Sequence, residues 1–192
     1  PIENKVKRGD IRVLKRDSVT GNPVAGAVFE FSRDKDFENI LATVTSDENG
    51  IAKLENVEKS TVYVREKTAP DGYAKNTSVK KAEIEENGQV IEFVYENEAY
   101  RGWITLHKTD IATKDNLTGI IYKVVADEDI YAIGHPVDEN GNKIIAYHKG
   151  DVVDTGISEN GLYATDETGT IFIGGENGLP MGKYAIFEVE TL

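Results

Sequence analysis

Lysine and glutamate recur at related places in the two halves of this 192-residue chain, and an asparagine, whose carboxamide can form an amide bond with a lysine amine, accompanies the first pair. These residues are Lys15, Glu66 and Asn97 in the first half and Lys108 and Glu188 in the second, with a further asparagine, Asn4, near the N-terminus. A lysine amine without water around it is neutral and nucleophilic, and it can attack the carboxamide of an asparagine. A protonated glutamate can polarise that carboxamide and move protons. The chemistry to consider is therefore a cross-link between side chains.

A repeated sequence motif places these residues in two modules. Seven residues have a residue of the same type 93 positions later in the sequence, for example Lys15 and Lys108 (108 minus 15 is 93). They are Glu3, Asn4, Arg8, Gly9, Ile11, Lys15 and Asp17. Such self-similarity indicates a tandem array of small domains. We expect residues 1–8 to be a linker or the tail of a preceding repeat and residues 9–97 to be the first domain. A linker at 98–101 and a second domain at 102–192 complete this division.

The second module is longer in its middle and shorter at its end. The motif Asp47-Glu48-x-Gly50 returns as Asp166-Glu167-x-Gly169, at an offset of 119 instead of 93. The second module therefore contains about 26 extra residues (119 minus 93) before this motif. We expect this insertion, at about 123–165, to form an extra hairpin or a long loop. No counterpart of the strand that precedes Asn97 follows before Leu192.

Short apolar runs between turn residues predict an all-β fold. Alternating side chains, separated by segments such as Asp47-Glu48-Asn49-Gly50 and Glu86-Asn87-Gly88, are typical of strands and tight turns. The strands expected in the first module are residues 10–16, 27–32, 40–45, 51–54, 61–67, 79–84 and 89–95. Seven short strands at this spacing favour tandem β-sandwich domains of the immunoglobulin-like kind.

The alternation also predicts which side chains point into the core. Side chains two positions apart share one face of a strand. The expected inward faces are Ile11, Val13 and Lys15; Val62, Val64 and Glu66; and Ile91, Phe93, Tyr95 and Asn97. Each apolar face thus ends in a polar residue. A solvated rim is the ordinary explanation for one such residue, but recurrence of the lysine and glutamate in the second module favours a chemical role.

That role is an intramolecular isopeptide bond. The Lys15 amine would attack the Asn97 carboxamide and release ammonia, while Glu66 would act as the acid. Folding would place the groups in contact, and this proximity would replace external activation. Each domain would react once on itself, so the protein would not be a turnover enzyme.

Composition excludes several other functions. A net charge of −12 would repel nucleic acid and anionic membranes. The chain has no cysteine, and its three histidines, His107, His135 and His148, are scattered without the spacing of a metal site. Asp138-x-Asn140-x-Asn142 lacks the correctly placed glycine and distal glutamate of a calcium loop, and a turn is expected there. No metal and no cofactor is therefore predicted.

The first module resembles the Cna B-type, or SpaA-like, repeat domains of Gram-positive surface adhesins and pilins. The similar stretches are residues 11–17, 21–29, 47–50 and 64–73, the last reading Val64-Arg65-Glu66-Lys67-Thr68-Ala69-Pro70-Asp71-Gly72-Tyr73. This resemblance implies a prealbumin-like sandwich in which Lys15 and Asn97 are cross-linked and Glu66 is the catalytic acid. In the second module it implies Lys108 as the amine and Glu188 as the acid.

The resemblance implies a structural function. The modules would be stalk or spacer repeats of an extracellular, cell-wall-anchored adhesin or pilin, with neighbouring repeats of the same chain as partners. The alternative is a ligand-binding module that uses the insertion to bind a host matrix protein or a glycan. Its candidate residues are Tyr131, His135, Tyr147 and His148. Asn4 is the counterpart of Asn97 and could be offered to Lys108 of another molecule.

Overall fold

The chain forms two compact units, Pro1–Ala99 and Tyr100–Leu192. The computed structural model describes residues 5–155 and 160–189, so Asn4 lies outside the described residues. Within those ranges every regular element is a strand, and no helix is long and apolar enough to cross a membrane. The expected all-β fold is therefore confirmed.

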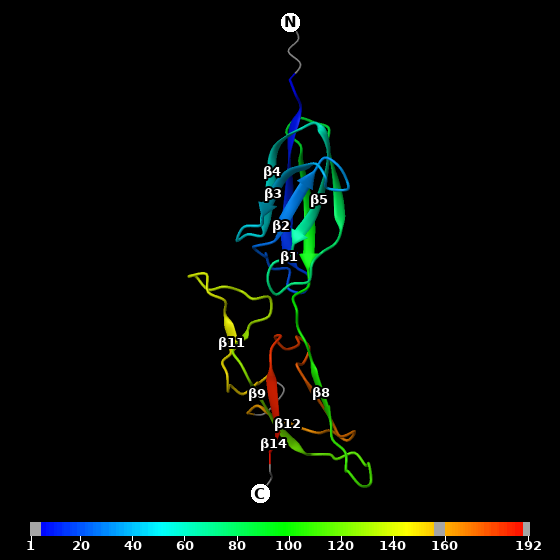
Figure 1. Ribbon diagram of the computed structural model, residues 1–192, viewed down its shortest axis with the longest axis vertical. Helices are drawn as coiled ribbons and strands as arrows, with labels where there is room; N and C mark the ends of the chain where they lie inside the picture. Colours follow the sequence, from blue (N-terminus) through cyan, green and yellow to red (C-terminus); the bar gives the residue numbers. More distant parts are fainter. Residues whose placement is uncertain (1–4, 156–159, 190–192) are drawn as a thin grey trace. The chain divides into compact units, whose positions relative to one another are not determined.

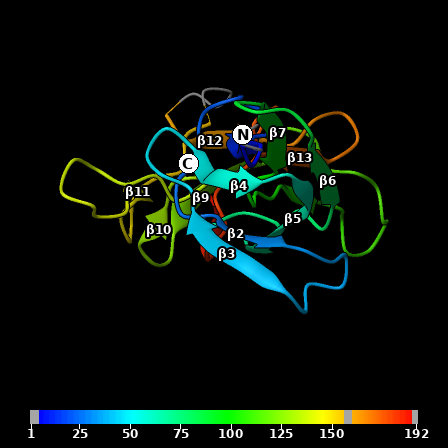
Figure 2. The ribbon, with the colours of Figure 1, turned by 90° about the horizontal axis from the view of Figure 1, so that it is seen from above.

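The first unit contains seven strands in two sheets. They are β1 (Arg8–Asp17), β2 (Val28–Ser32), β3 (Ile40–Thr45), β4 (Ile51–Glu58), β5 (Ser60–Thr68), β6 (Val79–Ile84) and β7 (Val90–Asn97). One sheet has the order β4-β1-β7 and the other the order β3-β2-β5-β6 (Figure 1). Figure 2 shows β2 between β3 and β5. Each strand overlaps one of the seven expected from the sequence.

Alternation along each strand produces the core between the two sheets. In β1 every second residue from Gly9 to Asp17 is buried, and the residues between them are partly exposed. Phe29, Phe31 and Tyr95 are the largest apolar side chains that are fully buried in this unit. The rings of Phe29 and Tyr95 meet edge to face at a centroid distance of 5.1 Å, a favourable aromatic geometry.

The first and last strands of this unit lie side by side. β1 and β7 pair in parallel over eight residues, from Asp10 opposite Val90 to Asp17 opposite Asn97. Lys15 is therefore opposite Tyr95, and Asn97 is one inward position further along β7. This register brings residues about 80 positions apart in the sequence to the same end of one sheet.

The second unit contains shorter strands. They are β8 (Ile104–His107), β9 (Ile121–Ala126), β10 (Ile130–Tyr131), β11 (Ile145–Tyr147), β12 (Leu162–Ala164), β13 (Thr170–Ile173) and β14 (Tyr184–Glu188). The sheets have the orders β12-β9-β14, β13-β8 and β10-β11. The order β12-β9-β14 corresponds to β3-β2-β5 of the first unit, and the order β13-β8 corresponds to β4-β1.

The insertion forms the hairpin of β10 and β11, in which Ile130 pairs with Tyr147. The expected range 123–165 also contains most of β9 and all of β12, which pair with each other as β2 and β3 do. The segment without a counterpart in the first unit therefore lies between Ala126 and Leu162. Sequence offsets alone could not separate these strands from the inserted hairpin.

Candidate functional site

Lys15 is a fully buried lysine on the inward face of β1. Its side chain has 0 % exposure. The amine Nζ donates hydrogen bonds to the backbone carbonyls of Arg16 and Tyr95, both at 3.2 Å. The backbone of Lys15 is also fixed, because its N–H donates to the Gly50 carbonyl at 2.6 Å. The amine is thus held in a defined place next to β7.

Burial changes the acidity of this amine. Desolvation lowers the pKa of Lys15 from 10.5 to about 8, and the negative charges of Glu66, Asp17 and Glu96 oppose that change only in part. A buried ammonium loses the hydration that stabilises its charge. A lysine with a pKa near 8 is neutral in roughly a tenth of molecules at pH 7, far more than an exposed lysine, and the neutral amine is the nucleophilic form.

Glu66 and Asn97 form a buried pair across the two sheets. Their exposures are 1 % and 3 %. The amide nitrogen Nδ2 of Asn97 donates to both carboxylate oxygens of Glu66, at 2.8 and 2.9 Å. The backbone N–H of Asn76 donates to Glu66 Oε2 at 2.7 Å. The carboxylate is therefore oriented by two different groups.

The other atom of the Asn97 amide is not satisfied. Among the described residues Asn97 Oδ1 is buried and has no hydrogen-bond partner. A buried carbonyl oxygen without a donor costs free energy. The structure thus brings Lys15, Glu66 and Asn97 to one end of the core, as the sequence predicted for the inward faces.

Two neighbours of this cluster were not singled out as site residues. Tyr95 lies opposite Lys15, and its hydroxyl donates to the Val64 carbonyl at 2.6 Å, which ties β7 to β5. Asn76 lies in the loop before β6, and its side chain also donates to the Glu96 carbonyl at 2.9 Å. The alternation of β7 already placed Tyr95 inward. No sequence pattern indicates that Asn76 reaches Glu66.

In the second unit Lys108 and Glu188 are also in contact, but near the surface. Lys108 Nζ donates to Glu188 Oε2 at 2.8 Å, and the two side chains are 33 % and 47 % exposed. Tyr122 donates to the same oxygen at 3.1 Å. The hydrogen bond to Glu188 raises the pKa of Lys108, and the reciprocal bond lowers that of Glu188. Both groups are charged in this arrangement.

Two of the four candidate ligand-binding residues of the insertion, Tyr131 and His135, contact each other edge to face at 5.5 Å. The Lys143 amine lies 5.2 Å from the Tyr131 ring centre. Tyr147 instead packs against the core of the unit. Asp138 accepts hydrogen bonds from the backbone of Asn140 and Asn142, both at 2.8 Å, which is the geometry of a turn.

Comparison with known proteins found a family match for the first unit. A family model described as SpaA, a prealbumin-like fold domain, matches residues 9–99. No curated protein matches the chain. Among solved structures the TIE protein of Bacillus anthracis has a TM-score of 0.64 and 22% identity, covering 96% of this chain. The chain spans 29% of that protein, and the likeness concerns the fold.

Two pilin structures are more distant. A streptococcal ancillary pilin has a TM-score of 0.43 at 19% identity, with 95% of this chain and 54% of that chain covered. BcpA, the major pilin subunit of Bacillus cereus, has a TM-score of 0.44 at 14% identity, with 95% and 88% covered. The family match and the two-sheet topology agree with each other: residues 9–99 match the SpaA model, which describes a prealbumin-like fold domain.

Proposed function

We propose that the first unit is a structural repeat of an extracellular adhesin or pilin, and that an autocatalytic isopeptide bond between Lys15 and Asn97 rigidifies it. The observation that carries this proposal is the burial of an amine, a carboxylate and a carboxamide at one end of the core. Three polar side chains at 0 to 3 % exposure are expensive to bury. Joining Lys15 to Asn97 in one amide removes the charge of the lysine, and Glu66 is not consumed.

The burial of Lys15 supports its role as the nucleophile. The reaction begins when the ammonium transfers a proton to the carboxylate of Glu66, which leaves a neutral amine and a neutral acid. Desolvation, the main cause of the lowered pKa of Lys15, favours this transfer. The amine then attacks Cγ of Asn97, the carbonyl carbon next to the unpartnered Oδ1.

The hydrogen bonds of Glu66 support its role as the acid. Asn97 Nδ2, the leaving nitrogen, already contacts both of its carboxylate oxygens. Protonated Glu66 can give a proton to that nitrogen. A bond forms between Lys15 Nζ and Asn97 Cγ, the bond from Cγ to Nδ2 breaks, and ammonia leaves with the proton that the attacking amine has lost. No external reactant is required.

The position of the bond suggests its mechanical effect. β1 and β7 are the first and last strands of the unit and lie side by side in parallel. A covalent link between them would carry tension from one end of the domain to the other and leave the enclosed strands unloaded. Such a domain suits a surface fibre whose partners are neighbouring repeats. The pilin structures named above are consistent with this role.

Intact mass spectrometry tests the bond in the natural sequence. We expect the chain to be lighter than its calculated mass by one ammonia, and digestion to yield a branched peptide that joins Lys15 to Asn97. Glu66→Ala should restore the full mass. Glu96→Ala is the matched control, because Glu96 is a charge partner of Lys15 but is exposed on the opposite face of β7. A full-mass natural chain refutes the proposal.

A further inference from the structure

Five asparagines of this chain are followed directly by glycine: Asn49, Asn87, Asn140, Asn160 and Asn177. In such a pair the backbone nitrogen of the glycine can attack the carboxamide of the asparagine and close a cyclic imide. Glycine permits this attack because it has no Cβ to hinder the approach. Each pair is also preceded by glutamate, so the immediate sequence does not rank the five pairs, and their contacts in the folded chain must distinguish them.

The attack has two requirements at the peptide group that joins the asparagine to the glycine. The glycine nitrogen must lose its proton, so its N–H must not be held in a hydrogen bond to another carbonyl. The anion that remains carries charge on the asparagine carbonyl oxygen, and a cation that donates to this oxygen stabilises it. The folded chain favours the reaction where both requirements are met.

The N–H requirement excludes three of the five pairs. The glycine N–H donates to a backbone carbonyl at 2.7 to 3.0 Å in these three: Gly50 to Asp47, Gly88 to Arg8 and Gly141 to Asp138. Among the described residues no acceptor faces the N–H of Gly161 or Gly178. The pairs Asn160-Gly161 and Asn177-Gly178 therefore meet the first requirement.

The contact with a cation selects between these two pairs. In the described part of the chain, three asparagine carbonyls accept a hydrogen bond from an arginine Nη1: Asn49 from Arg16 at 3.0 Å, Asn56 from Arg8 at 3.1 Å and Asn177 from Arg101 at 3.1 Å. Asn56 is followed by Val57, whose branched side chain hinders the attack. Within the described ranges, Asn177 alone combines the arginine contact with a glycine whose N–H is not engaged.

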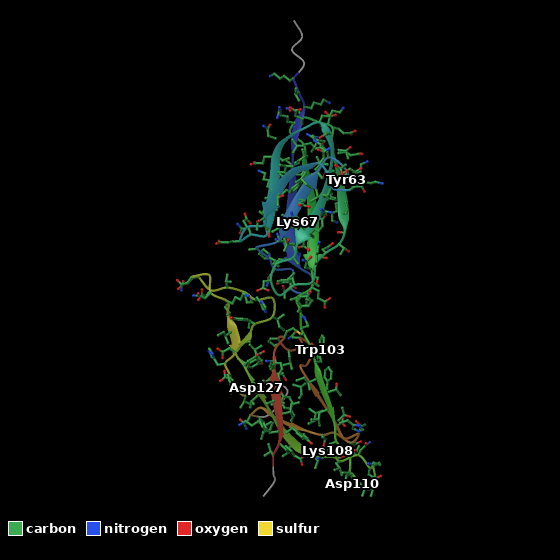
Figure 3. The ribbon with its side chains drawn as sticks, in the orientation of Figure 1. Tyr63, Lys67, Trp103, Lys108, Asp110 and Asp127 are labelled. Carbon is green, nitrogen blue, oxygen red and sulfur yellow. The ribbon has the colours of Figure 1, made fainter. Side chains whose placement is uncertain are left out.

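The loop between β13 and β14 holds this peptide group in place. Gly102 and Leu179 exchange two backbone hydrogen bonds, at 2.9 and 2.7 Å. Trp103, labelled in Figure 3, donates from Nε1 to the Gly175 carbonyl at 2.8 Å. The backbone is thus fixed on both sides of Asn177, whereas the side chain of Asn177 is exposed and can turn toward the next nitrogen.

Glycine at position 178 serves the arginine contact as well as the attack. Its φ is 73°, in the left-handed region that favours glycine. A Cβ on Gly178 would lie 3.2 Å from three side-chain carbons of Arg101. A larger residue would therefore press on the arginine, and glycine lets the guanidinium reach the Asn177 carbonyl.

We propose that Asn177 is a self-modification site, which is converted to aspartate and isoaspartate through a cyclic imide that Arg101 promotes. The Gly178 nitrogen gives its proton to a solvent base and forms a bond to Cγ of Asn177. The bond from Cγ to Nδ2 breaks, and ammonia leaves with a proton from solvent. Water then opens the imide: addition at Cγ gives aspartate, and addition at the backbone carbonyl carbon gives isoaspartate. No oxidant or reductant is involved.

Either product changes the loop. A carboxylate replaces a neutral amide close to the Arg101 guanidinium, and the net charge of −12 gains one negative charge. In isoaspartate the main chain passes through Cβ and Cγ, so it is one atom longer before Gly178. The paired hydrogen bonds of Leu179 with Gly102 must then adjust, and the connection from β13 to β14 is altered permanently.

Peptide mapping of the folded natural chain, incubated at neutral pH in water labelled with heavy oxygen, tests the proposal. We expect Asn177 to convert faster than the other four asparagines by a factor of about ten or more, since a hydrogen bond to a charged oxygen is worth that much. Both products should appear, each with one labelled oxygen. In denaturant the five rates should become similar. A folded chain in which Asn177 reacts no faster than Asn49 or Asn160 overturns the inference.

Replacing the arginine separates activation from restraint of the loop. Arg101→Met keeps the aliphatic stem, removes the charge and should slow conversion of Asn177 about tenfold. Arg101→Lys should restore part of the rate. If the arginine only restrained the loop, its loss would loosen the loop and speed the reaction, so an unchanged or faster rate in Arg101→Met overturns the inference. Arg8→Met, which removes the similar contact with Asn56, is the matched control and should leave the rate at Asn177 unchanged.

The same maps keep this inference separate from the proposed function. The imide is one ammonia lighter than the unmodified chain, as a cross-linked chain is, but the change lies within the peptide that contains Asn177. The proposed bond of the first unit instead joins the peptides of Lys15 and Asn97. Each result is therefore read from different peptides, and failure of one leaves the other standing.

Discussion

Removing the amine of Lys15 without changing the shape of the core gives the most informative stability test. Lys15→Met keeps a long unbranched side chain at a position with 0 % exposure and abolishes the proposed bond. A cross-link that closes a loop of roughly 80 residues stabilises by about 4 to 5 kcal/mol through loop entropy. For a domain of about 90 residues this corresponds to a melting temperature lower by about 20 °C.

A double-mutant cycle separates the stabilisation due to the bond from the stabilisation due to the two side chains themselves. Asn97→Ala removes the same bond and also the rest of the Asn97 side chain, which lies next to Glu66. Because either change alone breaks the bond, the double variant should lose about 4 to 5 kcal/mol less than the sum of the single losses. Denaturant unfolding monitored on the isolated variants measures each free energy. Additive losses, within about 0.5 kcal/mol, would refute the reasoning.

Three further outcomes are expected. In Asn97→Ala the Lys15 amine persists with a folded pKa of about 8, below its unfolded value, so the unfolded chain holds the proton more tightly. The unfolding free energy should then rise by about 2 kcal/mol between pH 8 and 10, whereas the cross-linked chain shows no such rise. Gly50→Ala should cost about 3 kcal/mol, because a Cβ at a φ of 72° would clash with the Lys15 carbonyl; Gly21→Ala, at the same φ in open space, should cost about 1 to 2. Glu30→Gln should cost about 1 to 2 kcal/mol in chemical denaturation at neutral pH, because this buried carboxylate contacts two basic side chains. Its lowered pKa, due first to the hydrogen bond from Lys67, means that this contribution is lost in acid.

The fold of the first unit was accessible from the sequence because its alternation is regular. Two strands begin and end at the residues expected from the flanking turn residues: Ile40–Thr45 and Val79–Ile84. The parallel pairing of β1 with β7 was less accessible, because no local signal records which distant strands are neighbours. The alternation of inward and outward side chains along each strand nevertheless indicated that Lys15 and Asn97 face inward, and both are buried.

The second unit shows where sequence patterns are insufficient. The offset of 93 positions matched Lys108 with Lys15, but it could not show that Lys108 remains 33 % exposed. Burial depends on what covers a residue, and the cover of Lys15 comes from β7, about 80 positions away in the sequence. Likewise, the repeated glutamate did not indicate the bond from Tyr122 to Glu188 at 3.1 Å.

The most direct test of the central claim is the intact mass of the natural chain, followed by sequencing of the peptide that contains Lys15. The account predicts a mass one ammonia below the calculated value and a fragment in which Lys15 Nζ is joined to the side chain of Asn97. A chain at full mass, with separate peptides for Lys15 and Asn97, would contradict it.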